Sequence, residues 1–282
     1  MKPLDPRVTP ARDDVAASFL RGKVQAQRFS DGAPHHVTVG LASLRVEPSD
    51  AAMQDTELLC GEDFVVYDEK DGWAWGQSTL DDYVGYVRSE ALASGIANAD
   101  RRVSALLTPV RPQADLKIPP LDLLPMNARV KAEGREKRFT RIAAERFVFT
   151  DHLKALGTFE SDWVAVAERF LGVPYVWGGR TVRGLDCSGL IQTALHAAGI
   201  ACPRDADMQE EAVGKALGIS DDFSGLQRGD LVFWKDHVGA MLDVTHMLHA
   251  NGFAMAVSIE PLKDVVQRNR DIGNAVSSIR RL

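Results

Sequence analysis

The 282-residue sequence lacks the features that mark exported, membrane-spanning and nucleic-acid-binding chains. Its start mixes prolines and charges where a secretory signal needs a basic segment followed by an unbroken apolar stretch. No window approaches the roughly 20 apolar residues of a membrane-spanning helix. There is no Lys/Arg block, and the net charge of -6 gives no electrostatic support for nucleic-acid or membrane binding. We therefore expect a cytoplasmic protein that binds neither nucleic acid nor membrane.

Cysteine is also scarce, because the chain has only Cys60, Cys187 and Cys202. Three scattered cysteines are too few for a disulfide framework, and in a reducing compartment a single thiol stays free to react. The remaining composition, 45% hydrophobic and 26% charged, is that of a globular protein with chain enough for two or three small cores.

The pattern of apolar residues divides the chain into four parts. Residues 1–34 are expected to form a lead-in with a short helix over Arg12 to Arg21. Short β-type runs punctuated by turn residues predict a small barrel over residues 35–95 and a second one over residues 96–155. Residues 156–282 contain the expected helices Trp163 to Gly172 and Cys187 to Ala198, followed by four strands after Gly229. The expected fold class is α+β, with helices packed on an antiparallel sheet behind two small β-barrels.

Cys187 lies in the first turn of the second predicted helix, whose apolar residues Leu190, Ile191, Ala194 and Leu195 repeat with helical spacing. The start of a helix favours the thiolate, and its unpaired amide hydrogens can hold an oxyanion. Gly178, Gly179 and Gly184 allow backbone to pass close to a substrate. A buried, inert cysteine is the alternative, and it is our interpretation of Cys60 and Cys202.

Two histidines follow in a predicted meander of strands, with His237 at the start of one run and His249 at the end of the next. Their midpoint falls on Asp243 in the turn, so the two imidazoles should lie opposite each other on one face. One histidine can then take the thiol proton while the other orients it, which gives a Cys/His/His triad. His35, His36, His152, His196 and His246 are interpreted as ordinary histidines.

A zinc site built from Cys187, His237 and His249 is a competing interpretation, since the same residue types ligate metal. The C-x-x-C and H-E-x-x-H spacings do not occur, so no metal and no cofactor are predicted.

The motifs VPYVWGG, LDCSGL, GDLVFW, HVGAML and LHAN, in this order, resemble the NlpC-type family of papain-like peptidoglycan endopeptidases. The resemblance covers about Trp163 to Leu282. It implies a papain-like cysteine peptidase domain with Cys187 as nucleophile, His237 as base and His249 as orienting residue. It also implies that Tyr175 lines the pocket near the oxyanion.

The N-terminal part is similar to a subgroup with two bacterial SH3-like barrels, the γ-D-glutamyl-L-diamino acid endopeptidases. This resemblance implies that Asp55, Tyr83 and Asp186 bind the free amine of an N-terminal L-Ala. Asp186 also fits a helix N-cap, and a carboxylate beside Cys187 opposes thiolate formation. Further candidates for substrate binding are Ser188, Arg204 and Asp205.

The sequence departs from the pattern of this subgroup at three positions. Tyr86 stands where Trp is common, Asp55 is shorter than the usual Glu, and Ala206 replaces a frequent hydroxyl residue.

The first functional hypothesis is hydrolysis of the γ-D-Glu to diamino acid amide, with diaminopimelate or Lys, in peptidoglycan stem peptides that have a free N-terminal L-Ala. A role in cytoplasmic murein peptide recycling would follow. The alternatives are a non-catalytic peptidoglycan-binding protein and a related amidase or acyltransferase.

Overall fold

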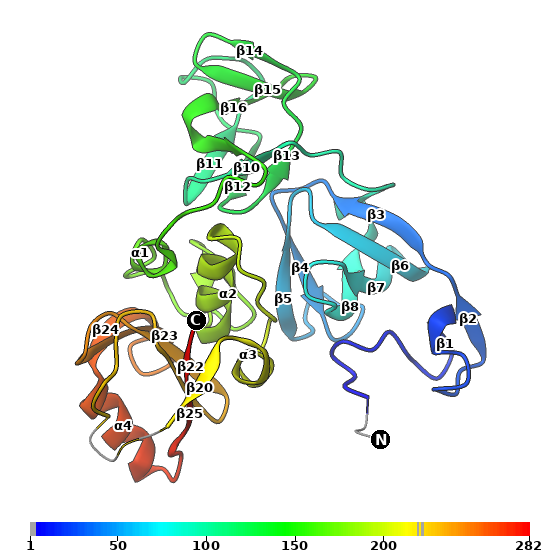
Figure 1. Ribbon diagram of the computed structural model, residues 1–282. Coiled ribbons are helices and arrows are strands. Elements are labelled where there is room, and N and C mark those ends of the chain that lie inside the picture. Colours follow the sequence, from blue (N-terminus) through cyan, green and yellow to red (C-terminus); the bar gives the residue numbers. More distant parts are fainter. Residues whose placement is uncertain (1–3, 219, 221–222) are drawn as a thin grey trace. The chain divides into compact units, whose positions relative to one another are not determined.

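The computed structural model describes residues 4–218, 220 and 223–282. The chain folds into two compact units, residues 1–156 and residues 157–282, and each is described by itself (Figure 1). Within the described residues no helix is long and apolar enough to span a membrane.

The lead-in contains short strands, so the helix predicted over Arg12 to Arg21 is wrong. The observed elements are β1 (Val15–Ala17), the 3-10 turn Ser18–Leu20 and β2 (Arg28–Ser30), which pairs in parallel with β1. Val15, Ala17 and Leu20 are buried against Tyr67 and Trp75, whereas Phe19 is exposed. Strand pairing and burial of both faces of β1 outweigh the helical spacing, because an isolated ten-residue helix has little stability of its own.

The first barrel is a seven-stranded antiparallel sheet in the order β5-β4-β8-β7-β6-β3-β9. Its core contains Leu44, Phe64 and Val87. Asp71 and Gly72 both have positive φ, at 52° and 79°, which suits the tight hairpin turn between β6 and β7. The strands are β3 (Ala33–Val37), β4 (Leu41–Arg45), β5 (Gln54–Leu59), β6 (Asp63–Lys70), β7 (Trp73–Ser78), β8 (Val84–Arg88) and β9 (Leu92–Ser94), with a 3-10 turn at Ser89–Ala91.

The second group of strands forms three small antiparallel sheets around a core that includes Val103, Val110, Leu124 and Val148. Lys117 to Pro120 lie in the loop between β11 and β12. The strands are β10 (Arg101–Val103), β11 (Leu107–Val110), β12 (Asp122–Pro125), β13 (Arg129–Val130), β14 (Gly134–Glu136), β15 (Phe139–Ala143), β16 (Arg146–Phe149) and β17 (Leu153–Ala155), with a 3-10 turn at Thr150–His152.

The C-terminal unit combines helices with a six-stranded antiparallel sheet in the order β20-β25-β21-β22-β23-β24 (Figure 1). A separate two-stranded hairpin joins β18 to β19. The elements are α1 (Trp163–Glu168), β18 (Arg180–Thr181), β19 (Gly184–Leu185), α2 (Cys187–Ala197), α3 (Ala206–Ala212), β20 (Lys215–Leu217), β21 (Leu231–Trp234), β22 (His237–Met241), β23 (His246–Asn251), β24 (Ala256–Pro261), α4 (Leu262–Asp271) and β25 (Val276–Arg281).

Helix α2 lies against β22, β23 and α1, and α4 buries Val265 and Val266 among Trp234, Met241 and Met247. The predicted α+β fold class is confirmed. The helix predicted to reach Gly172 is shorter than expected, since α1 ends at Glu168 and the chain turns at Gly172 with φ at 82°. Helices α3 and α4 and strand β25 were not among the predicted elements.

Candidate active site

Cys187 is the first residue of α2, as the sequence predicted. Asp186 is the N-cap, and its Oδ1 accepts a 2.7 Å hydrogen bond from the backbone N–H of Gly189. Leu190, Ile191 and their apolar neighbours on α2 are fully buried. Because this helix is capped at its start and anchored along its length, it holds Cys187 in one position.

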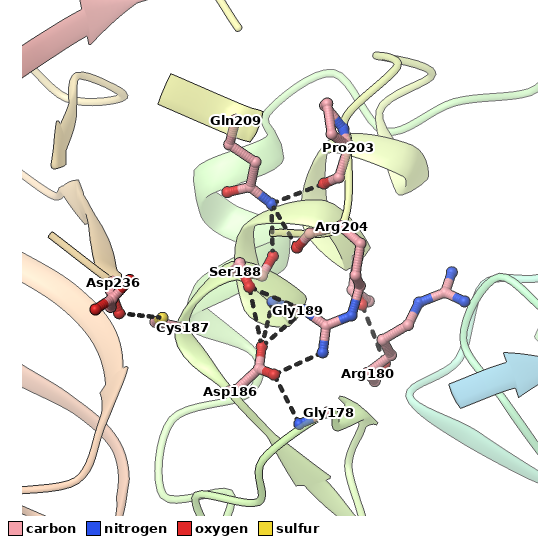
Figure 2. Close-up of polar contacts among 11 residues, drawn as sticks. Gly178, Arg180, Asp186, Cys187, Ser188, Gly189, Pro203, Arg204, Gln209 and Asp236 are labelled. Atoms are coloured by element: carbon pink, nitrogen blue, oxygen red, sulfur yellow. Dashed lines mark hydrogen bonds and ion pairs between the residues drawn. The ribbon is translucent and has the colours of Figure 1, made fainter. Parts of the chain in front are cut away.

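The Cys187 thiol contacts the backbone on both sides of His237. Its Sγ lies 4.0 Å from the carbonyl oxygen of Asp236 (Figure 2), and the N–H groups of Val238 and Ser188 are directed at the sulfur. The hairpin turn at Asp236, where φ is 63°, therefore brings the start of β22 to the start of α2.

Burial, followed by the charge of Asp186, raises the pKa of the Cys187 thiol to about 12. The backbone N–H groups of Val238 and Ser188 lower this pKa, but desolvation and the like charge of Asp186 outweigh them. That the helix start favours the thiolate stays a prediction.

His237 and His249 form a hydrogen-bonded pair, with His237 Nε2 at 2.8 Å from His249 Nδ1 and ring centroids 5.1 Å apart. The predicted register was wrong by two residues. Strands β22 and β23 pair Ala240 with Leu248, which places Gly239 and not His237 beside His249. A shift of two keeps both imidazoles on one face, so they meet diagonally. A Cβ on Gly239 would lie 3.1 Å from that of His249, so glycine leaves room here.

Burial, and next the neighbouring His249, lowers the pKa of His237 to about 3. At neutral pH the free protein therefore holds a neutral imidazole beside a neutral thiol. A neutral imidazole has a lone pair on one ring nitrogen, and Nε2 of His237 is engaged with His249. We therefore predict that Nδ1 of His237 accepts the thiol proton.

Asp186 is held by Arg204, as Figure 2 shows. Arg204 donates to both carboxylate oxygens, at 3.0 Å to Oδ1 and 2.6 Å to Oδ2, and their side chains are 1% and 8% exposed. Gly178 N–H donates to Oδ2 at 2.8 Å, and Ser188 Oγ lies 3.3 Å from Oδ1. The N-cap interpretation of Asp186 is confirmed, and the charge is balanced by a buried guanidinium. Direct contact of Asp186, Ser188 and Arg204 with substrate stays a prediction.

Glycines in the loop before α2 and in its first turn let two backbone segments pack closely against each other. A Cβ on Gly189 would lie 2.1 Å from the carbonyl oxygen of Gly179, and a Cβ on Gly179 would lie 2.4 Å from that of Gly184. The loop therefore packs tightly on the first turn of α2, and this contact places Gly178 N–H against Asp186.

Tyr175 is the predicted pocket residue whose phenol is affected by the charge of Cys187. Burial, and then the charges of Cys187 and Asp186, raises the pKa of its phenol, so it stays a hydrogen-bond donor at neutral pH. Asp205 occupies the N-cap position of α3.

In the N-terminal unit, Asp55 is on β5 and Tyr83 packs in the core of the first barrel. Substrate contacts of Asp55, Tyr83, Tyr175 and Asp205 stay predictions.

Glu260 is a residue that the sequence analysis missed. Its Oε1 lies 2.9 Å from His249 Nε2, across the pairing of β23 with β24. The available signal was the two-residue periodicity of β24, which puts Glu260 on the same face as His249. Among the described residues, no group of three or more His, Cys, Asp or Glu side chains is arranged to hold a metal ion.

Comparison with protein families and known proteins agrees with this geometry. Residues 172–274 match the NlpC/P60 family, and residues 44–92 match the bacterial dipeptidyl-peptidase SH3 domain. The γ-D-glutamyl-L-lysine dipeptidyl-peptidase of Bacillus cereus is 26% identical over 239 residues, which are 74% of this chain and 70% of that protein. The protein of the same name from Bacillus subtilis is 30% identical over 166 residues, 55% of this chain and 53% of the relative.

A crystal structure of an NlpC/P60 family protein from Bacillus cereus has the same fold, with a TM-score of 0.75 at 19% identity over 88% of this chain and 99% of that one. The family match covers α2, β22 and β23, which carry the thiol and the histidine pair. The C-terminal unit is therefore a cysteine peptidase domain of the NlpC/P60 family, and a bacterial dipeptidyl-peptidase SH3 domain precedes it in the sequence.

Proposed function

We propose that this peptidase hydrolyses the amide between γ-D-Glu and a diamino acid, diaminopimelate or Lys, in peptidoglycan stem peptides with a free N-terminal L-Ala. The observation that carries the proposal is the presence, in one chain, of a Cys187–His237–His249 site and a dipeptidyl-peptidase SH3 domain. Two curated relatives with matching segments are named γ-D-glutamyl-L-lysine dipeptidyl-peptidases. The partner is thus a short peptide derived from peptidoglycan.

The reaction proceeds through an acyl-enzyme. The thiol proton moves to His237 Nδ1 while Sγ forms a bond to the γ-carbonyl carbon of D-Glu. We assign stabilisation of the oxyanion to the backbone N–H groups at the start of α2 and to the Tyr175 phenol. The C–N bond then breaks, and the imidazolium proton passes to the amine of the leaving diamino acid.

Deacylation uses the same groups in reverse. His237 takes a proton from water, the hydroxide attacks the thioester, and Cys187 leaves as a thiolate that regains the proton. The products are L-Ala-γ-D-Glu and a peptide or amino acid that begins with the diamino acid. His249 keeps His237 in place through both steps by means of the 2.8 Å hydrogen bond.

Recognition of the free amine is assigned to Asp55 and Tyr83, a carboxylate and a hydroxyl of the first barrel. Asp186 already has an ion-pair partner in Arg204, so its share in amine binding is the smaller one. An N-acetylated peptide brings no positive charge for the Asp55 carboxylate to bind, so we expect it to be the poorer substrate.

The test compares L-Ala-γ-D-Glu-diaminopimelate, its Lys analogue and the N-acetylated form of each, with products identified by mass. We expect cleavage at the γ-D-Glu bond and kcat/KM at least about a hundredfold lower for the acetylated peptides. Asp55→Asn and Tyr83→Phe should narrow this difference while turnover continues.

Equal kcat/KM for free and acetylated peptides would show that the enzyme does not select for a free N-terminal amine. A general cell-wall endopeptidase would then be the better interpretation. Peptide binding without any product would favour the non-catalytic binding protein. Cleavage of a different acyl bond, or transfer to an added amine, would favour the amidase or acyltransferase.

Cytoplasmic recycling of trimmed stem peptides is part of the proposal, because selection for a free L-Ala suits peptides already released from the glycan. Cell fractionation of the source organism tests it, and accumulation of the protein outside the cytoplasm would contradict it.

A further inference from the structure

A partly buried carboxylate ends the hydrogen-bond chain that begins at His237. His237 Nε2 bonds to His249 Nδ1 at 2.8 Å, and His249 Nε2 bonds to Glu260 Oε1 at 2.9 Å. His249 is 1% exposed and the Glu260 side chain is 16% exposed, so the middle of this hydrogen-bond chain is shielded from water and its carboxylate end is partly accessible. It connects three elements, β22, β23 and β24.

The far oxygen of Glu260 belongs to an ion pair with α4. Arg268 Nη1 donates to Glu260 Oε2 at 2.9 Å, and the guanidinium stacks 4.0 Å above the ring of Phe253. Ser258 Oγ donates to Oε1 at 3.3 Å. Burial opposes ionisation, but the hydrogen bonds from Arg268 and His249 lower the pKa of Glu260, so the carboxylate is charged at neutral pH.

The charge on Glu260 determines which nitrogens carry protons. An ionised carboxylate only accepts hydrogen bonds, so His249 Nε2 must carry its hydrogen. Burial lowers the pKa of His249, so the ring is neutral at neutral pH and its Nδ1 is bare. A bare Nδ1 accepts, so His237 Nε2 must donate to it. Neutral His237 then has its lone pair on Nδ1, the nitrogen assigned to take the thiol proton.

We propose that Glu260, held ionised by Arg268, is a positioning residue that sets the tautomers of both histidines and so makes His237 Nδ1 the general base. The same carboxylate also stabilises the imidazolium pair while the proton resides there, because a negative charge at the end of the chain attracts it. The proposal rests on the cysteine-peptidase chemistry and not on the substrate proposed above.

Replacing Glu260 with Gln makes a sharp test because Arg268 can only donate. The amide oxygen of the new side chain must face Arg268, so its NH2 group must face His249 Nε2. His249 would then carry its hydrogen on Nδ1 and donate to His237 Nε2. This reverses the chain, places a hydrogen on His237 Nδ1 and blocks the base.

The experiment uses the full chain with Glu260→Gln, Arg268→Met, the double variant and a control, Arg270→Met. Arg270 is an exposed residue of the same helix whose recorded contact is with the ring of Phe223. Three quantities are measured: kcat and KM on L-Ala-γ-D-Glu-Lys, the rate of Cys187 alkylation by iodoacetamide, and the imidazole 15N shifts that distinguish the tautomers.

For Glu260→Gln we expect kcat to fall about a hundredfold or more with KM within about twofold, since a wrong tautomer removes the base and leaves binding intact. The 15N chemical shifts should show that the hydrogen lies on Nδ1 rather than Nε2 in both histidines. The rate of Cys187 alkylation should fall. In the double variant the amide is free to turn its oxygen to His249, so kcat and the original tautomers should recover in part. Arg270→Met should match the parent protein.

Unchanged tautomers in folded Glu260→Gln, or a loss of kcat that Arg268→Met does not relieve, would overturn the proposal. The alkylation and 15N readouts need no peptide, so they separate a failure of this inference from a failure of the proposed substrate. Urea unfolding of each variant shows whether a loss of activity comes from unfolding alone. If it does, and the protein that remains folded keeps the native tautomers, the result counts against the proposal.

Discussion

Removing the guanidinium that balances Asp186 should destabilise the catalytic unit far more than removing a surface charge. Arg204→Met keeps most of the side-chain volume but deletes the donors at 3.0 Å and 2.6 Å from Asp186. The pair is buried, with side chains 1% and 8% exposed. Breaking a buried ion pair by removing one partner costs about 3–5 kcal/mol, because a charge remains without compensation.

The expected loss lies at the lower end of that range, about 3 kcal/mol, because other donors remain. Asp186 keeps the backbone N–H groups of Gly178 and Gly189, at 2.8 Å and 2.7 Å. In a domain of this size the loss lowers the unfolding temperature by roughly 10 °C. The matched control is Arg228→Met, because Arg228 pairs with Asp162 and Glu168 at the surface, where it is 38% exposed. That change should cost only about 0–1 kcal/mol.

The assay is urea unfolding of the full chain, with peptidase activity and α2 amide exchange identifying the transition of the catalytic unit. In the double variant Asp186→Asn with Arg204→Met, much of the stability should return because no unpaired charge remains. Arg204 also lowers the pKa of the Cys187 thiol, against burial and Asp186, so Arg204→Met should slow alkylation at a given pH. If Arg204→Met and Arg228→Met unfold at the same urea concentration, the reasoning about this buried pair is wrong.

Three further outcomes are expected. Cys187→Ala should abolish turnover with the fold retained, and the parent enzyme should lose activity with iodoacetamide but keep it in EDTA; a chelator-sensitive enzyme with bound zinc would contradict the thiol mechanism. The thiol pKa is raised and the His237 pKa is lowered, so the alkylation rate, corrected with Cys187→Ala, should rise roughly tenfold per pH unit through neutrality. A flat profile would instead reveal a preformed ion pair. Gly189→Ala should destabilise the protein by about 1–3 kcal/mol, although alanine favours helices, because its Cβ meets the Gly179 carbonyl at 2.1 Å; Gly218→Ala, in open space, is the control in the same unfolding assay.

Local signals in the sequence identified α2 and the position of the thiol. The apolar residues of α2 repeat every three or four positions, Asp186 stands at the N-cap, and Gly199 follows the helix with φ at 78°. Each of these is decided by neighbours within one or two turns, so the sequence alone contains the information. The same holds for the meander, in which turns separate four short apolar runs.

The lead-in shows where local signals are insufficient. The spacing of Val15, Phe19 and Leu20 suits a helix, yet Val15 to Ala17 pair with β2 and pack near Trp75. A strand partner thirteen residues away and an aromatic surface from another part of the unit are invisible in a short window, and together they outweigh the local preference.

The sequence by itself determined the position of the Cys187 thiol at the start of a helix and the common face of the two histidines, because a two-residue period survives an error of two in the register. Only the tertiary structure decided the diagonal contact of His237 with His249, the pairing of Arg204 with Asp186 and the hydrogen bond of Glu260 to His249. These are contacts between side chains 11 to 18 residues apart, and their geometry depends on the register of the strands and on which charges are buried together. The position of the thiol is decided by neighbouring residues in the sequence. Its raised pKa, in contrast, depends on the groups that surround it in the folded protein.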